Sequence, residues 1–177
     1  PINELSAMTL GIVGYGELGQ GVARIAAAFD MDVIVAARPG SPDVPEGRVA
    51  FDELLRRADV ISLHCPLNSA TRGLFGAAEF RRMKSSGVLI NTARGALVDT
   101  QALADALQSG EIAAAAIDVL PKEPPVDGDP LLDYAGRNLI VTPHIAWGTR
   151  EARQAGLDQL TANIAAFLNG EEKNRVV

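Results

Sequence analysis

The chain has 177 residues, 47% of them hydrophobic and 21% charged, as in folded globular proteins and unlike disordered ones. Its 16 Lys and Arg against 22 Asp and Glu give a net charge of -6, which leaves no broad basic surface for nucleic acid or an anionic membrane. The single cysteine, Cys65, excludes an internal disulfide, and two histidines with one cysteine argue against a metal site. Because no apolar run has membrane-spanning length and no signal peptide is visible, we expect a cytoplasmic protein.

Short apolar runs alternate with segments of helical periodicity along almost the whole chain. Such runs are typical of strands that are buried on both faces, where apolar residues follow one another without alternation. A long stretch rich in Pro, Gly and Asp precedes the last run. In chain order, the predicted strands are Thr9–Gly14, Asp32–Ala36, Val60–Leu63, Val88–Asn91, Ala113–Val119 and Leu139–Val141.

The first predicted helix begins at Leu18. Apolar residues recur from there at steps of three and four, which is the spacing of one helix face. Two shorter helical stretches are expected further along, at Phe51–Ala58 and Ala77–Met83. The apolar face of the first helix consists of Leu18, Val22, Ile25, Ala26 and Phe29.

Two later helices have recognisable ends. Asp99 or Thr100 can cap one helix, which ends at Ser109–Gly110. Thr149 can cap the last helix, which ends at Asn169–Gly170. The apolar face of this last helix consists of Leu157, Leu160, Ile164, Phe167 and Leu168.

The alternation of strands and helices predicts the fold class. Consecutive strands separated by helices pair in parallel through right-handed crossovers. Strands that are apolar throughout imply a sheet covered on both faces. The sequence therefore predicts an α/β fold with a doubly wound parallel sheet of about six or seven strands.

A Gly-x-Gly-x-x-Gly pattern connects the first strand to the first helix. Gly14 permits the tight turn, Gly16 lets the backbone approach a pyrophosphate, and Gly19 lets the helix close against the strand. The helix N-terminus is then directed at the anion. A glycine-rich turn without a ligand is the alternative, but the strand–turn–helix context favours a Rossmann dinucleotide-binding domain.

The end of the second strand bears on which dinucleotide is bound. A carboxylate there favours NAD because it accepts hydrogen bonds from the adenosine ribose, whereas a nearby arginine accommodates the 2′-phosphate of NADP. This chain has Ala37 and then Arg38 at that place, with Ser41 as a further donor. The pattern favours NADP. NAD stays open, since Arg38 could instead be an ordinary solvated loop residue.

Three polar segments follow later strands, at the sheet edge where open α/β folds bind ligands. Their side chains suit reduction of a 2-keto acid. Arg94 can hold a carboxylate through two parallel hydrogen bonds, and His144 can give a proton to the developing alkoxide. Glu123 beside the histidine would favour its protonated form. The alternatives are a surface ion pair for Arg94, an exposed loop residue for Glu123 and a structural role for His144.

These motifs together are specific enough to indicate a family. The whole chain resembles the nucleotide-binding domain of the D-isomer-specific 2-hydroxyacid dehydrogenases, and within that family the glycerate dehydrogenases, also called hydroxypyruvate (glyoxylate) reductases. The segments that carry the resemblance are Gly14–Gly19, Asn91–Gly95, Asp118–Pro125 and Pro143–Gln154.

The resemblance implies a role for each residue of the predicted site. Arg94 would orient the substrate carboxylate and carbonyl, His144 would be the acid/base, and Glu123 would tune it. Asp118 would meet the nicotinamide carboxamide. The residues expected to bind the cofactor are Gly14, Gly16, Glu17, Leu18, Gly19, Ala37, Arg38, Cys65, Pro66, Thr71, Thr92, Ala93, Arg94, Asp118, His144 and Ala146.

The resemblance also implies a larger protein. Family members carry a second, mostly N-terminal domain that closes over the cofactor and completes the substrate pocket. We therefore expect residues 1–148 to form the dinucleotide-binding domain and residues 149–177 to return toward a substrate domain that this chain lacks. The expected partners are a small 2-keto acid and a second copy of the protein.

Two other functions are considered. A non-enzymatic, cofactor-sensing interaction protein of the corepressor type stays open, because such relatives retain the same residues. A short-chain dehydrogenase needs a Tyr-x-x-x-Lys pair, and neither Tyr15 nor Tyr134 has a lysine four residues later. The sequence therefore excludes a short-chain dehydrogenase.

Overall fold

The structure, a computed structural model, describes residues 2–38, 41 and 43–175. The chain divides into two compact units, residues 1–143 and residues 144–177, and each is described here by itself. The boundary expected from the sequence lies a little later, between residues 148 and 149. That domain boundary stays a prediction.

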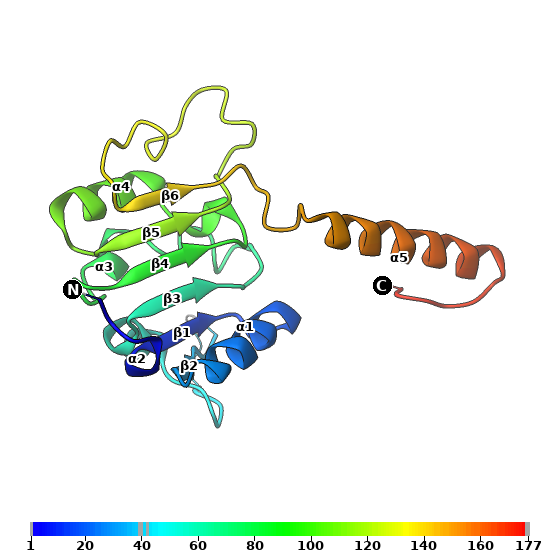
Figure 1. Ribbon diagram of the computed structural model, residues 1–177, viewed down its shortest axis with the longest axis horizontal. Helices are drawn as coiled ribbons and strands as arrows, with labels where there is room; N and C mark the ends of the chain where they lie inside the picture. Colours follow the sequence, from blue (N-terminus) through cyan, green and yellow to red (C-terminus); the bar gives the residue numbers. More distant parts are fainter. Residues whose placement is uncertain (1, 39–40, 42, 176–177) are drawn as a thin grey trace. The chain divides into compact units, whose positions relative to one another are not determined.

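The first unit is built on a six-stranded sheet in which every neighbouring pair of strands is parallel. The strand order is β2-β1-β3-β4-β5-β6, as Figure 1 shows. The predicted α/β class and parallel pairing are therefore confirmed. The strands are β1 Thr9–Val13, β2 Asp32–Val35, β3 Val60–Leu63, β4 Val88–Asn91, β5 Ala114–Ile117 and β6 Leu139–Val141.

The chain changes direction across the sheet once. From β1 it moves outward to β2, then crosses back to place β3 on the other side of β1. One further parallel bridge, between Ala36 and Val49, lies beyond β2, where dinucleotide-binding sheets carry an additional outer strand. The switch point of this fold is thus between the ends of β1 and β3, the place where open α/β sheets bind ligands.

The strand register aligns the carboxyl ends of five strands. Val13 pairs with Leu63, Leu63 with Asn91, Asn91 with Ile117, and Ile117 with Val141. Because the strands are parallel, the residue that follows each member of this row leaves the sheet at the same edge. Those residues are Gly14, His64, Thr92, Asp118 and Thr142.

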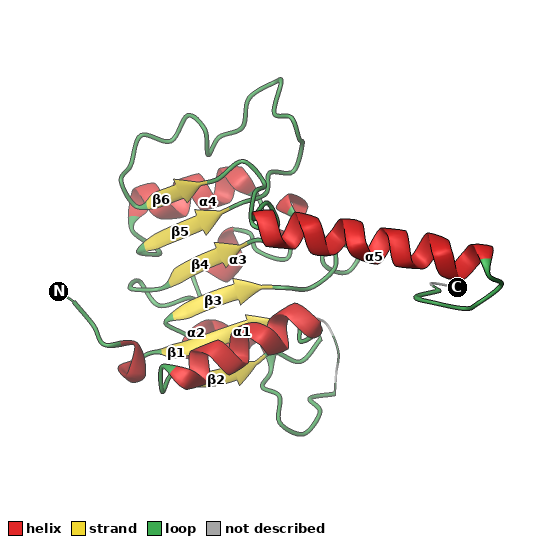
Figure 2. Ribbon diagram, turned by 45° about the vertical axis from the view of Figure 1, so that its right-hand side comes forward, coloured by secondary structure: helices red, strands yellow, loops and turns green. Residues whose placement is uncertain are grey.

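Helices α2 to α4 and helix α1 pack on opposite faces of this sheet, as the two separate apolar clusters show. Leu54 of α2, Phe80 of α3 and Leu103 of α4 belong to the larger cluster. Figure 2 shows α1 in front of the β1 and β2 end of the sheet. Two short 3-10 turns, η1 Leu5–Ala7 and η2 Gly95–Leu97, complete the unit. The helices are α1 Glu17–Ala28, α2 Phe51–Arg57, α3 Ala77–Phe80 and α4 Thr100–Ser109.

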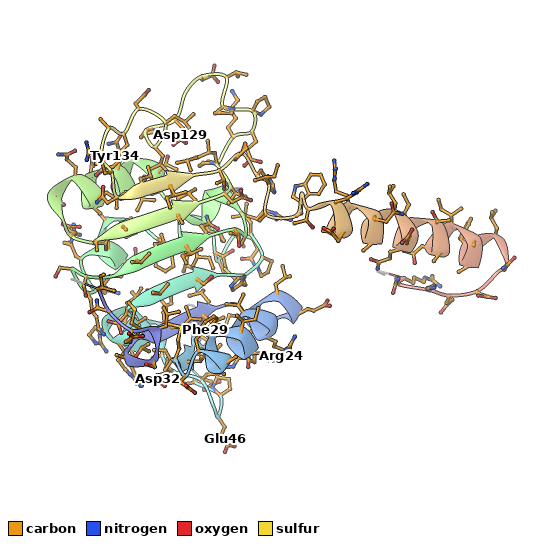
Figure 3. All side chains as sticks on the ribbon, viewed as in Figure 1. Arg24, Phe29, Asp32, Glu46, Asp129 and Tyr134 are labelled. Carbon is orange, nitrogen blue, oxygen red and sulfur yellow. The ribbon has the colours of Figure 1, made fainter. Side chains whose placement is uncertain are left out.

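The face that α1 presents to the sheet agrees only in part with the prediction, because Ala26 is buried and Val22 packs against the smaller cluster. Gly19, Ala23 and Ala26 are its buried residues, whereas Leu18 and Phe29 of the predicted apolar face are exposed (Phe29 is labelled in Figure 3). Small side chains let a helix lie close to the flat sheet surface, so the large apolar residues are left to the side. Hydrophobic periodicity selects the larger apolar residues as the buried face, so it did not predict that α1 approaches the sheet through its small residues.

The sheet is also not covered evenly on its second face. Leu10 and Ile12 of β1 are buried against α1, but Ile140 of β6 is 64% exposed in this unit. Ala114 and Ala116 of β5 are partly exposed. The expectation of a sheet covered on both faces is therefore correct for β1 to β3 and wrong toward β6.

The second unit contains one long helix, α5 Arg150–Leu168. The Thr149 hydroxyl accepts a hydrogen bond from the backbone nitrogen of Ala152 at 3.1 Å, which confirms the predicted cap. In the first unit, Asp99 rather than Thr100 caps α4, because its carboxylate accepts from the Ala102 nitrogen at 3.0 Å. Large apolar side chains of α5 are more than half exposed: Leu157, Leu160, Ile164, Phe167 and Leu168.

Candidate active site

The glycine loop between β1 and α1 is packed tightly against the end of β3. Gly14 has a φ of +95°, a conformation that side chains other than glycine rarely adopt. A Cβ atom at this residue would also lie 2.6 Å from the Cα of Cys65. Both the backbone angle and the close approach therefore require glycine, and they fix this loop at the switch point of the sheet.

The other two glycines of the loop, Gly16 and Gly19, differ in their surroundings. This difference is the one expected of a loop that binds a pyrophosphate. A Cβ at Gly19 would collide with the carbonyl oxygen of Gly14, so Gly19 is needed for helix packing. A Cβ at Gly16 would meet nothing within 4 Å. No contact within the described part of the chain therefore explains Gly16, whereas a dinucleotide phosphate approaching the backbone does. Glu17 and Leu18, also predicted to bind the cofactor, begin α1.

A cavity of about 840 Å³ extends from the glycine loop past the end of β2. It brings together six residues that the sequence predicted to bind the cofactor: Gly14, Ala37, Arg38, Cys65, Pro66 and Thr71. The predicted donor Ser41 lines it as well. Its position at the switch point and its mixed polar and apolar lining suit the adenosine half of a dinucleotide.

Arg48 also lines this cavity and was missed by the sequence analysis. Its guanidinium carbon lies 4.7 Å from the ring centroid of Tyr15, and its Nη1 donates to the carbonyl oxygen of Ala36 at 3.4 Å. In the sequence Arg48 is separated from β2 by a Pro- and Gly-rich loop. Only the pairing of Val49 with Ala36 returns it to the cavity.

The two residues that follow β3, the partly buried His64 and the buried Cys65, have shifted pKa values. Burial lowers the pKa of His64, whose Nε2 lies 2.9 Å from the Ser62 hydroxyl. Burial raises the pKa of the Cys65 thiol. The lowered pKa favours the neutral form of His64 near neutral pH.

The loop that carries Arg94 is fixed by the side chain of Asn91. Asn91 is 1% exposed at the end of β4, and its Nδ2 donates to the Arg94 carbonyl oxygen at 3.0 Å. Its Oδ1 accepts from the Ala93 nitrogen at 3.0 Å. The exposed Arg94 guanidinium donates from Nη1 to the Ala93 carbonyl at 2.6 Å. Thr92, the remaining predicted residue of this loop, is exposed.

Gly95 brings the Arg94 loop against the loop that carries Glu123. A Cβ at residue 95 would collide with the backbone of Leu120 and Pro121. Glu123 belongs to the same turn, because its Oε1 accepts from the Leu120 nitrogen at 2.8 Å. The segments bearing two of the three predicted catalytic residues are therefore in direct backbone contact.

Asp118 lies at the same edge of the sheet, directly after β5. It is 5% exposed, and its backbone nitrogen donates to the Asn91 carbonyl at 2.9 Å. Its Oδ1 accepts a hydrogen bond from the Thr142 hydroxyl, which follows β6. A buried carboxylate held in this way is a well-defined acceptor for a donor group at the edge.

His144 and Ala146 belong to the second unit, so the predicted site residues are not all placed in one unit. His144 has a φ of +52°, which is uncommon for a residue other than glycine. Conformations of this kind gather at functional sites, where the surrounding structure maintains them. The structure thus assembles the glycine loop, the cavity, the Arg94 loop and Asp118 in the first unit, and it places His144 at the start of the second.

The comparison with known proteins identifies the family. Residues 1–146 match the model of the D-isomer specific 2-hydroxyacid dehydrogenase, NAD binding domain. The chain belongs to this family. The resemblance predicted from the sequence is thereby confirmed, together with the Rossmann-type fold of a nicotinamide-dependent dehydrogenase.

Curated members of the family are similar over almost the whole chain. The chain is 46% identical to the glycerate dehydrogenase of Methylorubrum extorquens over 99% of its own length and 55% of that protein. It is 39% identical to the hydroxypyruvate reductase of Blautia hydrogenotrophica, again over 99% of the chain and 55% of the relative. The chain thus spans about half the length of these curated relatives. Both are enzymes, and the comparisons give no support to the corepressor-type alternative.

Solved structures of the dehydrogenases show the same fold. The NAD complex of the D-isomer specific 2-hydroxyacid dehydrogenase from Lactobacillus delbrueckii is 33% identical, with a TM-score of 0.86, over 99% of this chain and 57% of that one. An acyclic imino acid reductase in complex with NADPH and D-Arg is 35% identical, with a TM-score of 0.82, over 100% of this chain and 56% of that one. Similar structures thus include complexes with NAD and with NADPH.

Residues 2–38, 41 and 43–175, which the structure describes, contain neither a metal-binding cluster nor a membrane-spanning helix. These residues hold no cluster of three or more His, Cys, Asp or Glu arranged to bind a metal ion. None of their helices combines the length and hydrophobicity needed to cross a membrane.

Proposed function

We propose that this chain supplies the cofactor-binding half of an enzyme that reduces a small 2-keto acid, glyoxylate or hydroxypyruvate, to the D-2-hydroxy acid. The observation that carries the proposal is the contact of the Arg94 loop with the Glu123 turn through Gly95. The parallel register of β1, β3 and β4 places the Arg94 loop at the same sheet edge as the glycine loop. The named activities of the similar proteins support the same substrate class.

The residues of the chain divide the work of binding and proton transfer. The bound nicotinamide supplies the hydride. Arg94 binds the substrate carboxylate and orients the carbonyl, and its guanidinium is suited to two parallel hydrogen bonds. His144 gives a proton to the carbonyl oxygen as it becomes a hydroxyl. Glu123 stabilises the protonated histidine, and Asp118 accepts from the carboxamide of the cofactor.

We further propose that the cofactor is NADPH in preference to NADH. Ala37 offers no carboxylate to the adenosine ribose, and Arg38 and Ser41 line the cavity at this place. Hydrogen bonds to a charged group contribute about 1.5–3 kcal/mol each, so the Arg38→Ala variant should lose roughly tenfold or more of its preference for NADPH. Fluorescence titration of both cofactors measures this directly. Equal affinities in the parent and the variant would remove the argument.

Turnover in the full-length protein tests the proposed activity itself. NADPH oxidation is followed with glyoxylate, hydroxypyruvate and pyruvate as substrates, and the Arg94→Lys variant is measured alongside. Because lysine cannot form the paired hydrogen bonds of arginine, KM for the keto acid should rise while cofactor affinity is retained. Cofactor binding without turnover on any keto acid would contradict the proposal and favour an interaction protein.

The exposed apolar side chains of α5 and the single cysteine bear on the assembly and the location of the protein. We propose a homodimer, supported by the exposed apolar side chains of α5, since large exposed apolar surfaces commonly mark contacts between proteins. We propose a cytoplasmic location, supported by the single buried cysteine, which suits a reducing compartment.

A further inference from the structure

Arg48 occupies a defined place at the end of β2 that no predicted role explains. It follows the loop that carries Glu46, labelled in Figure 3. The next residue, Val49, donates to the Val35 carbonyl at 2.9 Å and accepts from the Ala37 nitrogen at 2.7 Å. These two backbone hydrogen bonds fix the Cα of Arg48 beside the outer end of the sheet.

The Arg48 guanidinium connects the glycine loop to the end of β2. It lies over the Tyr15 ring, 4.7 Å from the centroid, and Tyr15 directly follows Gly14. Its Nη1 also reaches the carbonyl of Ala36, the residue that follows β2. In dinucleotide-binding folds, the glycine loop binds the pyrophosphate, and residues at the end of the second strand recognise the adenosine ribose. The guanidinium thus lies near the end of β2, the part of such folds that recognises the adenosine ribose.

The contacts hold the charge of Arg48 in place without cancelling it. A ring face attracts the cation but contributes no negative charge, and a backbone carbonyl accepts only one of its five donors. Arginine is well suited to phosphate because its planar group offers donors in pairs. Arg38 and Ser41 line the same cavity, and Asp43 is the acidic residue among its lining.

We propose that Arg48 is a specificity-determining residue that binds the 2′-phosphate of NADPH, as a second cation beside Arg38. This proposal rests on the NADPH preference proposed above and extends it to a residue on a different segment. Arg38 reaches the cavity from the loop after β2, whereas Arg48 reaches it from the segment that pairs alongside.

The test compares two ligands that differ by one phosphate. The affinity of the full-length protein for 2′,5′-ADP and for 5′-AMP is measured by isothermal titration calorimetry. In Arg48→Met, which retains most of the side-chain length, affinity for 2′,5′-ADP should fall about tenfold or more while that for 5′-AMP stays within about twofold. Arg48→Lys should bind 2′,5′-ADP with intermediate affinity. Arg81→Met, a change at an exposed arginine after α3, should alter neither affinity.

The outcomes separate this proposal from the one on which it rests. If Arg48→Met weakens both ligands equally, the residue only shapes the adenosine pocket, and the proposal is wrong. If Arg38→Met removes the preference for 2′,5′-ADP and Arg48→Met does not, the NADPH preference stands and Arg48 has no part in it. If the parent protein does not prefer 2′,5′-ADP, both proposals fail. Arg48→Lys retains the charge, so it decides the matter if Arg48→Met does not fold.

Discussion

Asn91 joins two parts of the candidate site through one side chain and one carbonyl group. Its amide holds the Ala93–Arg94 backbone, and its carbonyl oxygen accepts from the nitrogen of Asp118. Because the side chain is buried, it has few alternative conformations. Arg94, the proposed substrate-binding residue, therefore starts from a backbone that is already ordered, which would lower the entropic cost of binding.

At the same scale, His144 has the role that is most directly testable. In the full-length protein, the His144→Ala variant should reduce keto acids about 10²–10⁴-fold more slowly, the usual effect of losing a general acid. Cofactor affinity should change little. Steady-state kinetics and cofactor titration measure the two quantities separately. Activity near that of the parent would return His144 to a structural role.

His64 makes the stability of the fold depend on pH in a predictable direction. Burial lowers its pKa below the ordinary value of about 6.5, so the unfolded chain binds this proton before the folded one does. Its contribution to stability is therefore present above about pH 6.5 and is lost as the pH falls below that value.

Urea unfolding at pH 7.5 and pH 5.5 measures this effect, because the carboxyl groups stay ionised over most of that range. The parent should lose more stability on acidification than the His64→Asn variant, in which the titrating group is absent. An equal loss in the two proteins would show that His64 is not the source.

Among the elements, the connections after β4 and β5 determine how the catalytic segments meet. In Gly95→Ala, the added Cβ would push the Leu120–Pro121 backbone away from the Arg94 loop. Since misplacement by about 1 Å can lower turnover roughly 10²-fold, kcat in the full-length protein should fall by about that factor. Gly21→Ala is the matched control, because its Cβ would meet only the Arg24 side chain at an ordinary 3.8 Å. Full turnover in Gly95→Ala would show that the loop contact has no catalytic importance.

The sequence predicted the fold best where a local pattern, such as an apolar run or a capping residue, determines the local structure. Apolar runs gave the strands nearly to the residue, and Thr149 gave the beginning of α5. The face of α1 was predicted only in part, because the small residues Gly19 and Ala23 join the predicted Ala26 in the contact with the sheet. Periodicity weighs side chains by hydrophobicity, and close packing of a helix on a sheet depends on their size.

The parts of the candidate site that consist of short sequence motifs could be predicted from the sequence. Arg94 and Asp118 each follow a strand, so their common edge follows from parallel pairing. Arg48 and Gly95 could not be found in this way, because their importance arises from contacts between distant segments. Such contacts depend on register and loop path, which no single stretch of sequence specifies.

For the whole molecule, binding and turnover should separate in a polypeptide of residues 1–177 produced by itself. The glycine loop, the cavity and Asp118 all lie in one unit, so the polypeptide should bind a nicotinamide dinucleotide. Because it spans about half of its relatives' length, it should reduce hydroxypyruvate at least about 10²-fold more slowly than a protein of the relatives' full length. Calorimetry and absorbance assays measure the two properties.

The same polypeptide should self-associate through the exposed apolar side chains of α5. Sedimentation velocity over a range of concentrations measures this, and Leu160→Glu with Phe167→Glu should reduce it. A monomeric polypeptide with the turnover rate of the full-length protein would contradict both expectations for the whole molecule.

The aligned carboxyl ends of five strands, from Val13 to Val141, allow the loops at this sheet edge to vary independently of one another. Each strand ends at the same level, so each following loop begins from a fixed anchor that does not depend on the length of its neighbours. In the function proposed here, the segment after β2 selects the cofactor, and the segments after β4 and β5 bind the substrate. Exchange of residues 37–48 for the equivalent loop of an NAD-dependent relative should therefore change the cofactor preference and leave the structure of the Arg94 loop unchanged. Evolution and protein engineering can alter these two properties one at a time.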